Sequence, residues 1–255
     1  MTRMLASVAN LEEALLVLQA GADLIDLKAP AAGALGALPP EAVRQIVTAV
    51  AGRRPVSATI GDLPMEPARV LEAAREMAAT GVDFVKVGFF PGGDWPGTVA
   101  ALAGLAAAGT RLVAVLFGDQ RPDFAMLQEL AGGGFAGAML DTLDKDAGPL
   151  TACCVLPELC DFVTGGRELG MLTGLAGSLR EADIQPLLAL HPDYLGFRGA
   201  LCLGGRRRLQ LDARRVSQIR WRIQSPANVS AGRAPAGSSD SDAGGRLRRD
   251  SPGTD

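Results

Sequence analysis

Short apolar stretches recur along the chain, and each is followed by a segment in which apolar residues repeat every three or four positions. The short stretches are typical of buried strands, and the segments between them are typical of amphipathic helices. We expect strands at residues 5–8, 24–30, 56–60, 84–89, 112–117, 138–142, 171–176 and 194–197.

Eight strands that alternate with helices predict parallel pairing through right-handed crossovers. A chain of this length closes such a pattern most economically as a single (β/α)8 barrel, which typically takes roughly 250 residues. The alternative is an open, doubly wound parallel sheet with the same alternation. We assign the barrel to residues 1–223 and a polar tail to residues 224–255, where apolar residues nearly vanish and disorder is expected.

Capping residues, prolines and glycines mark where the helices between the strands begin and end. Asn10 starts the first helix, and Glu13, three residues later, completes a capping box. Pro157 is expected to interrupt the helix after the sixth strand, and Gly165-Gly166 to end it. The other helices are expected to begin near residues 39, 67, 98, 123, 184 and 212.

Composition and charge narrow the classes of function. The chain has 255 residues and a formal net charge of −3, which argues against a general binder of nucleic acids or membrane surfaces. No stretch approaches the ~20 uncharged apolar residues of a membrane span, and the first residues lack the pattern of a signal peptide. We therefore expect a cytoplasmic protein with a small-molecule substrate, and we expect it to form a homo-oligomer.

Metal binding is not expected from the cysteines and the histidine. Cys153, Cys154, Cys160 and Cys202 lack the paired spacing of a zinc site, and the lone His191 cannot form a histidine cluster. We interpret the four cysteines as reduced, structural thiols.

One predicted strand carries two charges on the same face. Asp26 and Lys28 alternate with Ile25 and Leu27. If this segment forms a strand, the two charged side chains therefore point in the same direction. A buried ammonium group is costly unless it is paired or neutral. Lys28 is therefore a candidate amine for chemistry.

Lysine is rare in this chain. Of the 25 basic residues only three are lysines, Lys28, Lys86 and Lys145, and all three fall at or near the ends of predicted strands. Arginine serves wherever a plain positive charge is needed, but it does not deprotonate to act as an amine nucleophile. Alternatively, codon bias removed most lysines and left these three by chance. Lysines left by chance would be scattered over helices and surface loops.

The active sites of (β/α)8 barrels are assembled at the carboxyl ends of the strands. The polar residues expected there are Asp26, Lys28, Asp62, Lys86, Asp119, Asp141, Lys145, Ser178 and Arg198. Inward lysines in one barrel lower each other's pKa, and a neutral amine can attack a carbonyl to form a Schiff base. Asp26 and Asp141 would orient the amines and move protons; alternatively, they form salt bridges with buried lysines and nothing more.

Two short pairs, Gly177-Ser178 and Arg198-Gly199, follow the last two strands, where phosphate-binding barrels hold phosphate. Glycine lets backbone amides approach an anion, Ser178 can donate a hydrogen bond, and the next helix adds its N-terminal dipole. A plain turn is the alternative. The run Arg206-Arg207-Arg208 could steer anionic substrates, but we interpret it as a solvated charged loop.

Six segments, in order, resemble the (5-formylfuran-3-yl)methyl phosphate synthase family, and the resemblance covers roughly residues 4–222. The segments are 24–30 (LIDLKAP), 56–62 (VSATIGD), 84–88 (FVKVG), 138–142 (AMLDT) with Lys145-Asp146, 175–178 (LAGS) and 196–200 (GFRGA). The resemblance implies a (β/α)8 barrel that condenses two glyceraldehyde 3-phosphate molecules into a furan aldehyde phosphate. Phosphate and water are lost, and no metal or organic cofactor takes part. The product belongs to the biosynthesis of methanofuran-type coenzymes of one-carbon metabolism.

The same resemblance implies roles for the charged residues. Lys28 is the Schiff-base lysine, Lys86 is a second active-site lysine, and Asp26, Asp141 and Lys145 take part in proton transfer. The chain departs from the usual family pattern in two segments, residues 147–149 and 203–206. The second departure replaces a lysine-containing glycine loop.

Two other functions fit the same residues. A class I aldolase acting on a sugar phosphate would share the imine lysine, but it would keep the phosphate and release no furan. A phosphate-ligand-binding barrel without turnover would share the anion site. The three inward lysines argue against the second alternative, because arginine serves ligand recognition alone.

Overall fold

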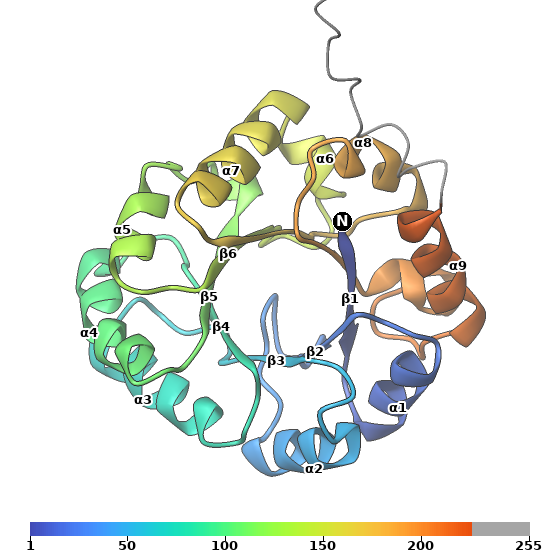
Figure 1. Ribbon diagram of the computed structural model, residues 1–255, viewed down its shortest axis with the longest axis horizontal. Coiled ribbons are helices and arrows are strands. Elements are labelled where there is room, and N and C mark those ends of the chain that lie inside the picture. The colour runs from blue at the N-terminus through green and yellow to red at the C-terminus, as the bar shows by residue number, and fades with distance from the viewer. Residues whose placement is uncertain (226–255) are drawn as a thin grey trace, which may run out of the picture.

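The computed structural model describes residues 1–225 and contains a closed barrel of parallel strands in the order β1 to β8. Figure 1 shows the strands as a central ring with the helices outside it. The predicted (β/α)8 barrel is confirmed, and the open-sheet alternative is wrong. The strands are β1 (Arg3–Val8), β2 (Leu24–Leu27), β3 (Val56–Thr59), β4 (Phe84–Gly88), β5 (Leu112–Phe117), β6 (Gly137–Asp141), β7 (Leu172–Leu175) and β8 (Tyr194–Phe197).

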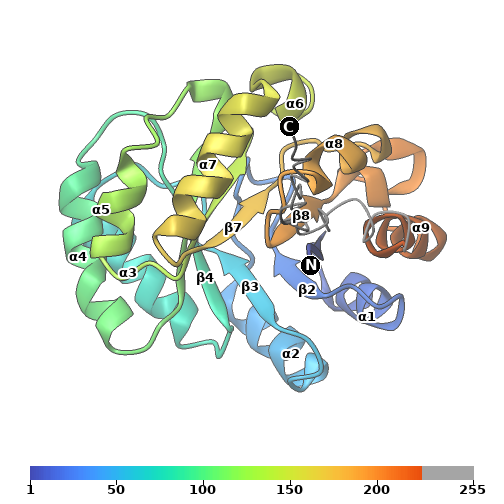
Figure 2. The same cartoon turned by 45° about the horizontal axis from the view of Figure 1, so that its top comes forward.

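Helices follow the strands and cover the outside of the ring (Figure 2). They are α1 (Leu11–Gln19), α2 (Pro40–Val50), α3 (Pro67–Ala78), α4 (Trp95–Ala107), α5 (Met126–Gly132), α6 (Leu150–Cys153), α7 (Leu156–Glu168), α8 (Ile184–Leu188) and α9 (Ala213–Gln224). None of the helices in residues 1–225 is long and apolar enough to cross a membrane. The disordered tail predicted for residues 224–255 falls almost wholly outside the described residues.

Half of the capping box predicted at the start of α1 is present, because Asn10 caps the helix but the Glu13 side chain accepts from Ala9 and not from Asn10. The Asn10 side chain accepts a hydrogen bond from the Glu13 backbone N–H at 2.9 Å. The Glu13 carboxylate returns toward the preceding turn and accepts from the Ala9 N–H at 2.7 Å. The first bond satisfies a backbone donor that the helix start leaves unpaired, and the second ties Glu13 to the end of β1.

The helix after β6 differs from the prediction. Pro157 lies in the first turn of α7 and does not interrupt it, because the first N–H groups of a helix need no intrahelical partner. Gly165-Gly166 lies inside the same helix and does not end it. A Cβ on Gly166 would come within 2.6 Å of Thr173 Cγ2, so glycine there lets α7 pack directly against β7. Helices α4 and α5 also begin about three residues away from the predicted positions, a typical error for helix ends.

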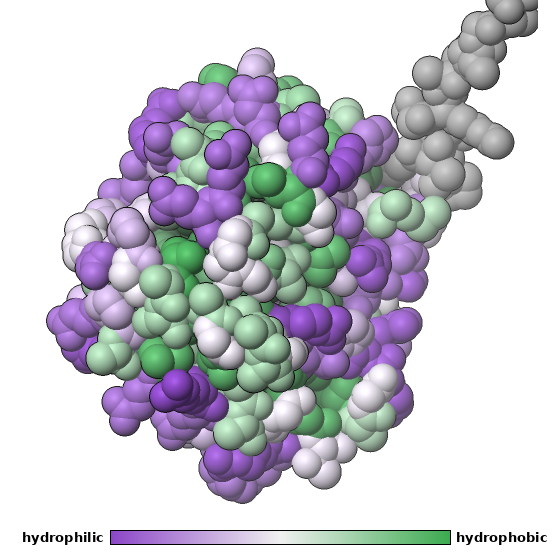
Figure 3. Space-filling view, turned by 60° about the vertical axis from the view of Figure 1, so that its left-hand side comes forward, coloured by the Kyte–Doolittle hydropathy of each residue, from purple (hydrophilic) through white to green (hydrophobic). Residues whose placement is uncertain are grey.

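The outer surface is mixed in hydropathy. Figure 3 shows apolar side chains gathered between polar ones on the face that carries α3, α4 and α5. Helix α4 has the sequence WPGTVAALAGLAA and contains no charged residue, which accounts for part of this apolar surface. The expected homo-oligomer stays a prediction.

Candidate active site

Three neighbouring strands place a carboxylate between two serines inside the barrel. In the register of the sheet, Ser7 of β1 lies beside Asp26 of β2, and Asp26 lies beside Ser57 of β3. Ser7 Oγ donates to Asp26 Oδ2 at 2.8 Å, and Ser57 Oγ donates to Asp26 Oδ1 at 2.7 Å. Lys86 Nζ of β4 completes this group at 2.9 Å from Asp26 Oδ1. We call these four buried side chains the inner cluster.

Asp26 is held as an anion in this environment. Burial raises the pKa of Asp26, but the charges of Lys86 and Lys28 and the hydrogen bond from Ser57 outweigh it, so the pKa lies below its ordinary value. Both carboxylate oxygens already accept hydrogen bonds. The Asp26 carboxylate therefore finds its hydrogen-bond partners within the inner cluster.

A second charged group lies where the strands end. The Lys28 backbone N–H donates to Val8 O at 3.0 Å, which continues the β1–β2 ladder one residue past β2 and keeps the Lys28 side chain on the face that Asp26 uses. Lys28 Nζ lies 3.8 Å from Asp141 Oδ2, on the other side of the barrel. Lys145 Nζ lies 2.5 Å from Asp141 Oδ1 and also donates to the Thr142 carbonyl oxygen. We call Lys28, Asp141 and Lys145 the mouth cluster.

The amine of Lys28 titrates far below an ordinary lysine. Burial is the largest cause, the negative charge of Asp141 opposes it, and the positive charge of Lys145 adds to it, so the pKa of Lys28 falls to about 8. With that pKa, about a tenth of the molecules carry a neutral Lys28 amine at pH 7. Asp141 stays ionised, because Lys145 and Lys28 lower its pKa by more than burial raises it.

The five predicted catalytic residues thus meet inside one barrel, divided between these two clusters. Asp26 and Lys86 belong to the inner cluster, and Lys28, Asp141 and Lys145 to the mouth cluster. Two residues of the inner cluster, Ser7 and Ser57, were missed by the sequence analysis. Their only signal is a polar residue at an inward position of an otherwise apolar strand.

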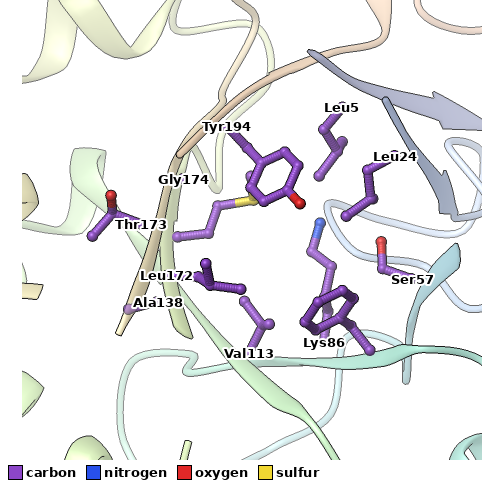
Figure 4. Close-up of a pocket in the computed structure, with 12 residues that line it drawn as sticks. Leu5, Leu24, Ser57, Lys86, Val113, Ala138, Leu172, Thr173, Gly174 and Tyr194 are labelled. Carbon is purple, nitrogen blue, oxygen red and sulfur yellow. The ribbon is translucent and has the colours of Figure 1, made fainter. Parts of the chain in front are cut away.

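A small cavity of about 30 Å³ lies inside the barrel beside the inner cluster. Figure 4 shows Lys86 and Tyr194 pointing into the centre of the barrel, with Leu5, Leu24 and Val113 around them. The walls are mostly apolar, so Lys86 lies at the boundary between the apolar barrel interior and the charged mouth. Asp26 is the one carboxylate among residues 1–225 in an ion pair with Lys86.

The predicted phosphate-binding pair after β7 forms a tight turn. Gly177 has φ 98° and Ser178 has φ 46°. A Cβ on Gly177 would lie 2.9 Å from the Thr142 nitrogen, so only glycine fits against the end of β6. Ser178 Oγ donates to the Lys145 carbonyl oxygen at 3.3 Å, which ties this turn to the loop that carries Lys145.

The side chain of Arg198 is held by contacts within the protein. Its buried guanidinium pairs with both oxygens of Glu13, at 2.5 and 3.0 Å. It also donates to the carbonyl oxygens of Ser7, Arg207 and Leu209, at 3.2, 2.9 and 3.3 Å. These contacts occupy all five N–H donors of the side chain, so none remains for the predicted phosphate contact. Gly199, the other residue of that pair, begins a short 3-10 helix (Gly199–Leu201).

Two further carboxylates at the strand ends hold loops in place. Asp62 accepts from the backbone N–H groups of Ala34 and Leu35, at 2.8 and 2.7 Å. Asp119 accepts from the N–H groups of Leu143 and Asp144, both at 2.8 Å. Within residues 1–225, no group of three or more His, Cys, Asp or Glu side chains is placed to hold a metal ion.

Several solved structures share the fold of this chain. A 3-hexulose-6-phosphate synthase superposes with a TM-score of 0.64 at 21% identity, over 87% of this chain and 100% of that one. A phosphoribosyl anthranilate isomerase from Thermus thermophilus gives 0.60 at 18% identity, over 91% of this chain and 100% of the other. At these identities the likeness shows the fold alone.

Sequence relatives are much closer. Residues 4–220 match the sequence model of a family described as 4-HFC-P synthase. A Methanopyrus kandleri protein named (5-formylfuran-3-yl)methyl phosphate synthase is 36% identical over 216 residues, 80% of this chain and 91% of its own. A Methylorubrum extorquens protein, which carries the same name with a provisional qualifier, is 48% identical over 217 residues, 85% of this chain and 89% of its own. The chain belongs to the 4-HFC-P synthase family.

Proposed function

We propose that the protein is a (5-formylfuran-3-yl)methyl phosphate synthase. It would join two molecules of glyceraldehyde 3-phosphate and release one phosphate and two waters, which balances the atoms of the furan product. The furan would serve in the biosynthesis of a methanofuran-type coenzyme. Relatives from Methanopyrus kandleri and Methanothermobacter thermautotrophicus that carry this name support the proposal.

One observation carries the mechanism: the Lys28 amine has a pKa of about 8 and lies 3.8 Å from an ionised Asp141. A neutral amine attacks the aldehyde of one triose phosphate and forms an imine with loss of water. The protonated imine withdraws electrons from the neighbouring carbon, so a proton leaves that carbon more readily and the resulting enamine can attack a second aldehyde.

Asp141 and Lys145 are the groups placed to move protons beside that imine. The Asp141 carboxylate can accept a proton, and the Lys145 ammonium at 2.5 Å can donate one. Lys145 is partly exposed and lies on a loop, so its ammonium can move toward the phosphate and water that leave during the reaction. Lys86 and Asp26 lie deeper and contribute a fixed positive and a fixed negative charge.

The amide-rich turn at Gly177-Ser178 and the start of the short helix at Gly199 stand at the barrel end where phosphates bind in similar folds. In this proposal they contact a substrate phosphate through backbone N–H groups. Arg198 supports the phosphate site indirectly, by holding the loop after β8.

The activity test uses the purified protein and glyceraldehyde 3-phosphate with no other addition. Inorganic phosphate and the ultraviolet absorbance of a conjugated furan aldehyde are followed together, and the product is identified by mass spectrometry. The proposal predicts that phosphate and furan appear in equal amounts. An aldol product that keeps both phosphates would indicate the class I aldolase instead, and the absence of any product would leave a binding protein.

A further inference from the structure

The loop between β8 and α9 is fixed over the carboxyl end of the barrel. Arg198 Nε donates to the Arg207 carbonyl oxygen at 2.9 Å, and another Arg198 nitrogen donates to Leu209 O at 3.3 Å. A Cβ on Gly199 would lie 3.2 Å from Gly205 O, so the loop packs closely on the end of β8. Arg198, itself paired with Glu13, therefore sets the position of the Arg207 backbone.

The Arg207 side chain spans from this loop to the loop after β2. One of its terminal nitrogens donates to Gly33 O at 3.0 Å. The Gly33 segment is itself held, because Asp62 accepts hydrogen bonds from the two following N–H groups. Arg207 thus bridges two loops that both border the mouth, and the second of them follows Lys28 directly.

Among residues 1–225, no carboxylate forms an ion pair with Arg207. Arg207 is half-buried, whereas its neighbours Arg206 and Arg208 are exposed. Its bond to Gly33 O is the one hydrogen bond that its side chain makes within residues 1–225, and none of the ion pairs there includes it. Burial lowers the pKa of Arg207, and the negative charge of Asp141 opposes that shift.

A half-buried cation with free donors and no counter-ion is suited to an incoming anion. We infer that Arg207 binds a phosphate group of the substrate at the barrel mouth, through two parallel N–H···O bonds. The ligand class is a phosphate monoester dianion, which a planar guanidinium recognises better than an ammonium does. That the ester is a triose phosphate rests on the proposed function; the anion contact does not.

The test measures binding of glycerol 3-phosphate to the purified full-length protein by calorimetry. This ester has no carbonyl, so it cannot form an imine and reports the anion contact alone. Arg207→Gln removes the charge and shortens the side chain. We expect its Kd to rise on the order of tenfold or more, with an unchanged melting temperature. Arg206→Gln and Arg208→Gln, matched changes in net charge on the same loop, should stay within about twofold of wild type, because exposed charges are screened.

The inference is overturned if Arg207→Gln binds glycerol 3-phosphate like wild type, if all three variants weaken equally, or if the wild-type protein does not bind it. Turnover is a separate readout. Furan formation with an unchanged KM in Arg207→Gln would sink the inference and leave the proposed function intact. Binding that depends on Arg207, in a protein that forms no furan, would sink the proposed function alone.

Discussion

The inner cluster and the mouth cluster contain the same kinds of side chain, a lysine beside an aspartate, and yet differ in how well those groups are satisfied. Asp26 accepts from two serines and from Lys86, all buried on strands. Lys28 lies 3.8 Å from a carboxylate that it shares with Lys145, and its pKa is near 8. A saturated pair is stable and chemically quiet, whereas an incompletely compensated amine is ready to react. Under the proposed function, the inner cluster would supply structure and electrostatics, and the mouth cluster would supply the covalent chemistry.

The largest effect is expected where that chemistry is removed. Lys28→Arg keeps the positive charge and most of the side-chain length, but a guanidinium does not form an imine. Turnover should fall by at least about a thousandfold, while circular dichroism and the melting temperature stay close to wild type. Retained turnover in this variant would remove the amine from the mechanism.

Next in size is the loss of the inner carboxylate. Asp26→Asn leaves Lys86 buried without its anion, so the free energy of unfolding measured in urea should fall by about 3–5 kcal/mol. Asp141→Asn is the matched variant at the mouth and should cost clearly less, because Lys28 can lose its proton and Lys145 can turn toward solvent. Equal losses from the two variants would contradict the distinction between the clusters.

The serines of the inner cluster should have a smaller and separate effect. Ser7→Ala or Ser57→Ala removes one donor from a buried carboxylate, with an expected loss of about 1–2 kcal/mol in the free energy of unfolding. Ser217→Ala, on the exposed surface of α9, is the control and should stay within about 0.5 kcal/mol. If the buried and exposed serines behaved alike, Asp26 would not need its two hydroxyl donors.

The smallest effect is a shift in pH dependence. If the neutral Lys28 amine is the reactive form, as the proposed mechanism requires, kcat/KM should rise with pH up to about 8 and then level off. The charge of Lys145 helps to lower the Lys28 pKa, so Lys145→Met should move the midpoint of the residual activity to higher pH. A midpoint that moves to lower pH, or a flat profile in the wild-type protein, would contradict this electrostatic coupling.

The barrel could be predicted from sequence because its strands are apolar and evenly spaced, and the closed β1–β8 order is the compact way to pair them. The error at Pro157 was one of position. Proline is tolerated in a first helical turn and disruptive further in, and the local pattern did not fix where α7 begins.

The candidate site was only partly readable for a related reason. The three lysines stood out because lysine is rare in this chain, but serines are common, and nothing local marks Ser7 and Ser57 as partners of Asp26. The contacts of two arginines could not be read from the local sequence either. Arg198 contacts Glu13 across 185 positions of sequence, and Arg207 contacts Gly33 across 174. Only the closed barrel therefore reveals that, within residues 1–225, all donors of Arg198 are engaged while Arg207 makes a single side-chain hydrogen bond.

The central claim is that Lys28, and not the inner lysine, forms the imine. Borohydride reduction of the protein in the presence of glyceraldehyde 3-phosphate, followed by peptide mapping, tests it most directly. The adduct should lie on the peptide that contains Lys28, and the rate of trapping should increase as the pH rises toward about 8. An adduct on Lys86 or Lys145, or no adduct while furan is formed, would contradict the division of roles between the two clusters.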